Sequence, residues 1–124
     1  MVLDVAHNPA GAWALRSALS ENFSGRELTF VFAAMRDKPL QEMAGILFPL
    51  AEQVVVTQVA NPRSATVSEL LQAASRTGVA MCVEENVTAA LARARELSKP
   101  DGVIVVTGSI FLVGEAMTLM GLQA

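Results

Sequence analysis

The sequence has little cysteine, little histidine and no cluster of positive charge, and each shortage excludes a class of function. A single cysteine, Cys82, rules out an internal disulfide and fits a reducing compartment. Cys82 lies in an apolar run, which predicts a buried structural thiol rather than a nucleophile. One histidine, one distant cysteine and no clustered carboxylates argue against a metal site. Nine basic and twelve acidic residues, without a Lys/Arg cluster, argue against a nucleic-acid partner.

Several familiar motifs are also missing. The dinucleotide fingerprint Gly-x-Gly-x-x-Gly and the P-loop Gly-x-x-x-x-Gly-Lys-Ser/Thr are both absent. The esterase motif Gly-x-Ser-x-Gly is absent as well, because the segment Thr107–Phe111 lacks the second glycine. Asp4 is followed two residues later by Ala6, where a phosphoryl-accepting hydrolase usually has a second aspartate. These absences leave no complete catalytic motif in the chain.

No secretory or membrane signal stands out. No signal peptide is visible, and the most apolar region, residues 103–120, is interrupted by glycine, serine and glutamate. We therefore expect a cytoplasmic protein with no membrane partner. The 124 residues are 52% apolar, which predicts a single folded domain over residues 1–124. Because the chain starts inside a strand, we expect this domain to be a fragment that has lost an upstream partner domain.

Apolar runs alternate with helical patterns, which predicts five β-α units. The expected strands are Met1–Leu3, Leu28–Ala33, Gln53–Thr57, Val79–Val83 and Val103–Thr107. The expected helices run from about Pro9 to Asn22, from Pro39 to Pro49, from Thr66 to Gly78, from Asn86 onward, and from about Ile110 to Leu122. Uninterrupted apolar strands are typical of a parallel sheet covered on both faces. The expected fold class is therefore α/β, a three-layer α/β/α Rossmann-like domain with a mainly parallel five-stranded sheet.

Polar residues gather where the strands end. In a parallel sheet all carboxyl ends lie on one edge, where ligands bind in open α/β folds. Three loops there carry reactive residue types, namely Asp4–Asn8, Asp37-Lys38 and Thr107–Ser109, and a loop containing Arg63 is a fourth candidate. We therefore expect Asp4, Asp37 and Ser109 on one edge of the sheet.

The first loop combines an aspartate and a histidine beside a helix start. Asn8 is a suitable N-cap and Pro9 suits the first helical position. After phosphoryl transfer and metal binding are set aside, Asp4 is either a carboxylate that accepts from ribose hydroxyls or a simple turn residue. His7 lies beside the positive end of the helix, which favours a neutral ring acting as hydrogen-bond donor.

The other two loops offer groups for an anion. Lys38 precedes a helix start, where a cation is unfavourable unless it faces an anion; a solvated surface lysine is the alternative. Ser109 stands where a strand meets a helix, so its hydroxyl and the nearby N–H groups can bind a carboxylate. A plain N-cap role would also satisfy this serine.

Four stretches together resemble a known family. Asp4-Val-Ala-His-Asn-Pro9, Asp37-Lys38, the Pro62–Thr66 loop and Thr107-Gly-Ser-Ile-Phe-Leu-Val-Gly-Glu115 occur in the order and approximate spacing of the C-terminal domain of folylpolyglutamate synthases. These enzymes, some of which are also dihydrofolate synthases, belong to the Mur-ligase family. The resemblance covers nearly the whole chain.

The resemblance implies a Mur-ligase C-terminal domain whose strands are ordered 1-5-2-3-4. In that family the upstream central ATPase domain holds a P-loop and Mg²⁺ and makes an acyl phosphate from ATP and a folate. By matching position, Asp4 would bind ATP through its ribose, and His7, Lys38 and Ser109 would bind L-glutamate, with Asn8 and Asp37 in support. No metal ligand and no catalytic residue is expected within this chain, which alone should be inactive.

Two other functions remain open at this point. One is a non-catalytic module that binds a nucleotide or small anion at the same edge. The other is a Mur-type ligase that uses a different amino acid. The folate form, the length of the product and the oligomeric state leave no mark in the sequence.

Overall fold

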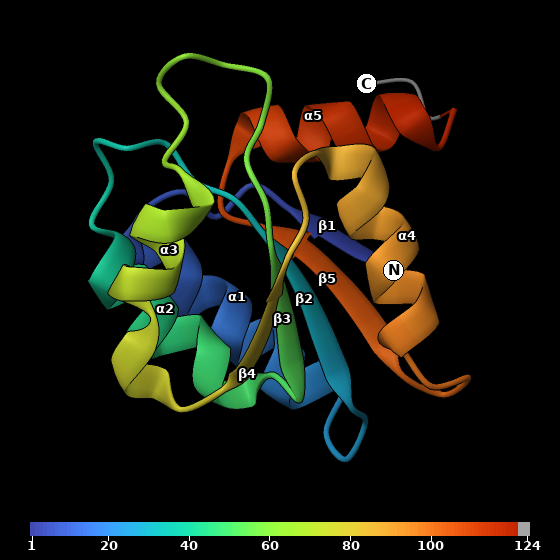
Figure 1. Cartoon of the computed structure of the whole chain (residues 1–124). Coiled ribbons are helices and arrows are strands. Elements are labelled where there is room, and N and C mark those ends of the chain that lie inside the picture. Colours follow the sequence, from blue (N-terminus) through green and yellow to red (C-terminus); the bar gives the residue numbers. More distant parts are fainter. Residues whose placement is uncertain (122–124) are drawn as a thin grey trace.

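Five parallel strands form one sheet in the order β1-β5-β2-β3-β4 in the computed structural model of the chain, which describes residues 1–121 (Figure 1). Their bounds are β1 Val2–Asp4, β2 Leu28–Phe32, β3 Gln53–Val56, β4 Ala80–Val83 and β5 Val103–Thr107. Every neighbouring pair is parallel. The α/β class and the strand order expected from the resemblance are both confirmed.

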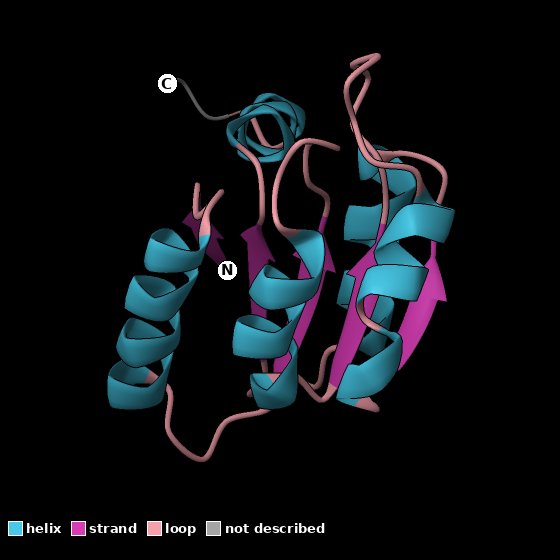
Figure 2. Ribbon diagram, turned by 90° about the vertical axis from the view of Figure 1, so that its left-hand side faces the viewer, coloured by secondary structure: helices cyan, strands magenta, loops and turns pink. Residues whose placement is uncertain are grey.

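Helices cover both faces of this sheet and make the outer layers. One face carries α1 (Pro9–Asn22), α2 (Leu40–Leu47) and α3 (Val67–Ala73), which stand side by side in front of the strands in Figure 2. The other face carries α4 (Val87–Leu97) and α5 (Ile110–Leu119). Short 3-10 turns, Phe48–Leu50 and Ser75–Thr77, follow α2 and α3. No helix within residues 1–121 has the length and apolar content to cross a bilayer.

The apolar strands supply two cores because their side chains alternate between faces. Phe30 and Val54 are buried beneath α1–α3, whereas Val31 and Val55 are buried beneath α4 and α5. Phe48 adds edge-to-face contacts with Phe32 at 5.0 Å between ring centroids. Central strands that are covered on both sides explain the continuous apolar runs in the sequence.

β4 is one of the two edge strands, and one expectation was wrong there. Its residues are half-buried or exposed. Cys82 is accordingly half-buried, although it packs partly against the α4–α5 core. An apolar composition does not distinguish an edge strand from a central one, because the difference lies in its neighbours.

The helix starts follow the predicted capping residues. The Asn8 side chain accepts a hydrogen bond from the Gly11 N–H at 2.7 Å, and Pro9 opens α1. Asn86 caps α4 in the same way. The expected end of α3 at Gly78 was wrong, because the helix stops at Ala73 and Gly78 ends the following 3-10 turn. The last helix ends at Leu119, and the expected end at Leu122 lies outside the described residues.

The capping box of α3 makes part of the folding stability dependent on pH. The Glu69 carboxylate accepts from the Thr66 N–H at 3.0 Å, and this bond is the main reason why the pKa of Glu69 lies below its ordinary value of 4.5. A carboxyl whose pKa falls on folding stabilises the protein above its unfolded pKa, and this contribution disappears as the pH falls through the folded pKa. The box therefore contributes fully at neutral pH.

We expect Thr66→Ala to lower the free energy of unfolding by about 1 kcal/mol at pH 7. Glu69→Gln should also destabilise the protein at pH 7, and its deficit relative to wild type should shrink below pH 4.5. Urea unfolding at several pH values measures both effects. A Glu69→Gln deficit that is the same at all pH values would contradict the assignment.

Candidate functional site

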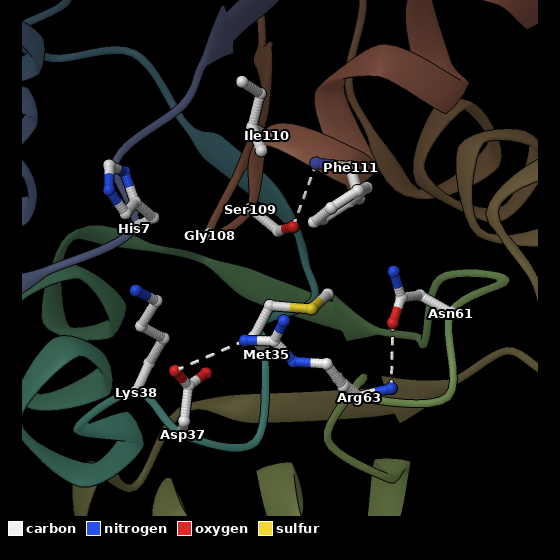
Figure 3. Close-up of a pocket in the computed structure, with 10 residues that line it drawn as sticks. All are labelled: His7, Met35, Asp37, Lys38, Asn61, Arg63, Gly108, Ser109, Ile110 and Phe111. Atoms are coloured by element: carbon white, nitrogen blue, oxygen red, sulfur yellow. Dashed lines mark hydrogen bonds and ion pairs between the residues drawn. The ribbon is translucent and has the colours of Figure 1, made fainter.

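A small pocket lies at the carboxyl ends of the strands, between the segments that follow β2, β3 and β5 (Figure 3). It encloses about 150 Å³, well below the roughly 300–1,000 Å³ typical of sites for drug-sized ligands. This size suits a small polar molecule rather than a whole nucleotide. Its lining residues are His7, Met35, Asp37, Lys38, Asn61, Arg63, Gly108, Ser109, Ile110 and Phe111.

The predicted site residues meet at this edge. Asp4 pairs in register with Thr107, which pairs in turn with Phe32, so β1, β5 and β2 end level with one another. Asp4 ends β1, Ser109 follows β5 and Asp37 follows β2, which confirms the expected common edge. Asp4 itself lines a neighbouring hollow beside α1, and His7 lines both hollows.

Gly108 allows β5 to turn into α5 at this point. Its φ of 115° is a conformation that side-chain-bearing residues rarely adopt. A Cβ atom on Gly108 would overlap the carbonyl oxygen of Ala33 and approach the Phe32 ring to 2.8 Å. The glycine therefore lets the β5 end lie directly against the β2 end, which brings Ser109 next to the loop of Lys38.

Ser109 is the N-cap of α5 and is 2% exposed. Its Oγ accepts from the Phe111 N–H at 3.1 Å, as an N-cap serine should. The hydroxyl proton is still able to donate to a ligand. The first turn of a helix has N–H groups without helical acceptors, and its dipole is positive. The capping role is therefore real and is compatible with binding an anion.

Lys38 is held by its own backbone at the start of α2. Its N–H donates to the Met35 carbonyl at 3.2 Å, and its carbonyl accepts from the Leu40 N–H at 2.8 Å. The side chain is half-buried and extends into the pocket toward His7 (Figure 3). Asp37 points instead to Arg63, whose guanidinium lies 3.8 Å from the carboxylate. Asp37 thus supports the opposite wall and leaves the Lys38 charge for a ligand.

The Arg63 loop is a true part of the site. An isolated antiparallel bridge joins Met35 to Ser64, and the Arg36 N–H donates to the Arg63 carbonyl at 2.8 Å. Asn61 orders the loop from within, because its side chain accepts from the Arg63 N–H at 2.8 Å. The Arg63 loop was predicted as a fourth candidate, but Asn61 was not singled out, because its only signal was its place in a polar loop.

His7 contacts the backbone of its own loop. Its Nδ1 lies 3.0 Å from the Val5 carbonyl oxygen, and a carbonyl can only accept, so Nδ1 carries the proton. In a neutral ring Nε2 is then an acceptor. The helix end was the only influence considered for this residue, and the local contact with Val5 decides the tautomer. His7 is thus suited to receive an N–H from a ligand's amino group.

The pocket gathers groups that favour an anion. Lys38 and Arg63 supply two cations, Ser109 supplies a hydroxyl at a helix N-terminus, and Asp37 offsets one charge. Across residues 1–121 no three His, Cys, Asp or Glu side chains gather closely enough to hold a metal ion. The fold and the pocket together define an α/β domain that carries these anion-favouring groups at the carboxyl edge of its sheet.

The chain belongs to the Mur ligase family: residues 1–110 match the family described as "Mur ligase, glutamate ligase domain". It is 36% identical to the dihydrofolate synthase/folylpolyglutamate synthase of Mycobacterium tuberculosis over 96% of its length, and it spans 28% of that relative. It is 38% identical to a probable bifunctional folylpolyglutamate synthase/dihydropteroate synthase of Haloferax volcanii, covering 95% of this chain and 14% of that relative.

Solved structures agree with this assignment. The folylpolyglutamate synthase of M. tuberculosis, crystallised with ADP and AMPPCP, superposes with a TM-score of 0.89 at 37% identity, over 97% of this chain and 29% of that one. The bifunctional enzyme of Yersinia pestis, solved with Mn, AMPPNP and L-glutamate, superposes with a TM-score of 0.84 over 97% of this chain and 29% of that one. Its 24% identity supports the shared fold alone.

Proposed function

We propose that this chain is the glutamate-binding domain of a cytoplasmic ATP-dependent ligase that adds L-glutamate to a folate. The observation that carries the proposal is the convergence of Lys38, Ser109 and the start of α5 on one small pocket. A carboxylate in that pocket gains a charge-assisted hydrogen bond from the lysine and the positive end of a helix. The similarity to folylpolyglutamate synthases supports glutamate over other anions.

Each polar group of the pocket matches a part of glutamate. Lys38 and Ser109 hold one carboxylate, and Arg63 on the facing wall is placed for the second. His7 Nε2, an acceptor in the neutral ring, faces the amino group. Amide formation joins the amino nitrogen to an activated carboxyl carbon, releases the activating phosphate and removes a proton from nitrogen. His7 orients the amine and accepts a hydrogen bond from it, while Asn8 and Asp37 support the loops.

ATP would supply the activating phosphate, and only part of its binding site is present here. The Asp4 carboxylate is half-buried at the end of β1, and Oδ1 accepts from the Ala6 N–H at 2.9 Å. Its second oxygen fits a ribose hydroxyl. In this proposal a central ATPase domain of the same enzyme would hold Mg²⁺. Related enzymes solved with ADP and AMPPCP, or with AMPPNP and a Mn ion, support a nucleotide and a divalent metal for the complete enzyme.

Titration of the isotope-labelled chain by NMR tests the proposal. L-Glutamate should shift amide signals of residues 35–38, 61–63 and 108–111, with weak binding on the order of 1 mM. L-Alanine and L-lysine should bind less tightly, because each lacks the second carboxylate. Equal shifts with any amino acid would favour a Mur-type ligase of different specificity. Strong shifts with inorganic phosphate or ATP, and none with glutamate, would favour a nucleotide or anion module.

The chain alone should neither hydrolyse ATP nor ligate glutamate. Phosphoryl transfer needs a backbone cradle, a lysine and a metal. The turn at Gly108 is filled by the β2 end, and Gly11 lies inside α1. An ATPase assay with Mg²⁺ on the purified chain measures this directly. Turnover that Asp4→Ala abolishes would show that the chain holds a complete active site.

A further inference from the structure

Glu115 lies on α5 outside the pocket, yet its carboxylate reaches the loop that carries Arg63. Its Oε1 accepts from the Ala60 N–H at 3.0 Å. Among the hydrogen bonds between residues 1 and 121, this one alone joins α5 to the loop formed by residues 57–66. The helix that begins at Ser109 is therefore tied to the residue just before Asn61.

The same loop is tied on its other side to the segment after β2. The Ala65 N–H donates to the Ala34 carbonyl at 2.9 Å, and the Arg36 side chain pairs with Glu69 at 3.3 Å, beyond the loop. The loop is also held at its start, where the Thr57 N–H donates to the Phe32 carbonyl of β2 at 3.0 Å, and from within, where the Ser64 Oγ accepts from the Val59 N–H at 3.2 Å. None of these bonds reaches Ala60, to which Glu115 adds a hydrogen bond from α5.

Three segments that line the pocket are thus connected in a ring: residues 33–38 (the Lys38 wall), residues 57–66 (the Arg63 wall) and residues 108–111 (the Ser109 wall). The Lys38 wall joins the Arg63 wall through bonds at residues 34–36 and 63–65. The Lys38 wall joins the Ser109 wall where Gly108 lies against Ala33. The Glu115 carboxylate joins the Ser109 wall to the Arg63 wall. Without it, no hydrogen bond between the described residues would join the Arg63 wall directly to α5.

We propose that Glu115 is a positioning residue for the glutamate site, which fixes Asn61 and Arg63 at the correct distance from Ser109. This inference rests on the proposed function, since it assumes that the pocket binds glutamate. Glu115 acts only as an acceptor for a backbone N–H, so an amide oxygen can replace its carboxylate. The role therefore depends on the length and acceptor atom of the side chain and not on its charge.

Steady-state kinetics of the complete ligase test the role. Glu115→Ala should raise KM for L-glutamate about tenfold, in line with the loss of one hydrogen bond to a charged group. KM for ATP and kcat should stay within about twofold. Glu115→Gln should restore KM to near the wild-type value. Glu96→Ala, on the exposed side of α4, is the matched control and should change none of these constants. A Glu115→Ala enzyme with unchanged KM for glutamate, or with all constants lowered equally, overturns the inference.

Hydrogen exchange on the 124-residue chain separates this inference from the proposed function, because it needs no ligand. The Ala60 amide should exchange faster in Glu115→Ala than in wild type, and Glu115→Gln should stay slow. If the exchange rates follow this order while glutamate fails to bind, the hydrogen bond between Ala60 and Glu115 exists but the proposed function is wrong, and the inference is then overturned as well. If the Ala60 amide exchanges equally fast in all three proteins, this hydrogen bond is absent and the inference alone is overturned.

Discussion

Replacement of Gly108 by alanine is expected to lower the free energy of unfolding by about 2–6 kcal/mol. The backbone φ of 115° costs a side-chain-bearing residue about 1–3 kcal/mol. The new methyl group would also overlap the Ala33 carbonyl and press on the Phe32 ring, and such overpacking typically adds about 1–3 kcal/mol. A loss of this size is a large part of the stability of a small domain.

The matched control is Gly45→Ala in α2, which introduces the same methyl group where no atom lies within 4 Å. There the change should stabilise the helix by about 0.5–1 kcal/mol. Urea unfolding followed by far-UV circular dichroism measures both variants. Tryptophan fluorescence is a poorer probe, because Trp13 is 55% exposed in the folded chain. Equal stabilities for the two variants would show that β2 and β5 do not approach as described.

Replacement of Lys38 by alanine is expected to lower kcat/KM for L-glutamate about ten- to a hundred-fold in the complete ligase. In the proposed site the ammonium group would make a charge-assisted bond to glutamate, typically worth about 1.5–3 kcal/mol, and every 1.4 kcal/mol is tenfold. KM for ATP should change little, because Asp4 lies in the neighbouring hollow and not in the Lys38 pocket. Kinetics in which each substrate is varied in turn distinguish the two effects.

The chain carries a matched control, since its other lysine is Lys99. Lys99 pairs with Glu27 at 3.0 Å at the start of β5, the opposite end of the strand from the pocket. Lys99→Ala should leave both substrates unaffected and barely change the stability, because exposed ion pairs contribute little. Equal losses for glutamate and ATP in Lys38→Ala would count against a glutamate site at Lys38.

Much of the fold could be predicted because the local sequence patterns match the strands and helices that the chain forms. Apolar runs located five strands to within one or two residues, and Asn8, Thr66 and Asn86 marked helix starts correctly. The sheet order could not follow from periodicity, since each strand is equally apolar, and it came from the resemblance. The apolar run around Cys82 likewise predicted a buried thiol, which is half-buried because β4 lies at an edge of the sheet.

The position of the site at one sheet edge was predicted, but the contacts that join its segments were not. Asp4, Lys38 and Ser109 follow strands directly, so a parallel sheet necessarily brings them to one edge. The Asp37–Arg63 pair and the Ala60–Glu115 bond join segments far apart in the sequence, and no local pattern marks them. The His7 tautomer depends on one backbone carbonyl whose direction is set only when the loop is folded.

The position of β5 also bears on how the chain folds. Within the described residues β1 pairs only with β5, so Val2–Asp4 gains a strand partner only after residues 105–107 have been made. β5 must then insert between β1 and β2 rather than add to an edge. Contacts between such distant segments slow folding, because a long loop must close before any pairing energy is gained. A chain being synthesised can therefore assemble β2, β3 and β4 early, but the ligand pocket, which requires Gly108–Phe111, forms in the last step.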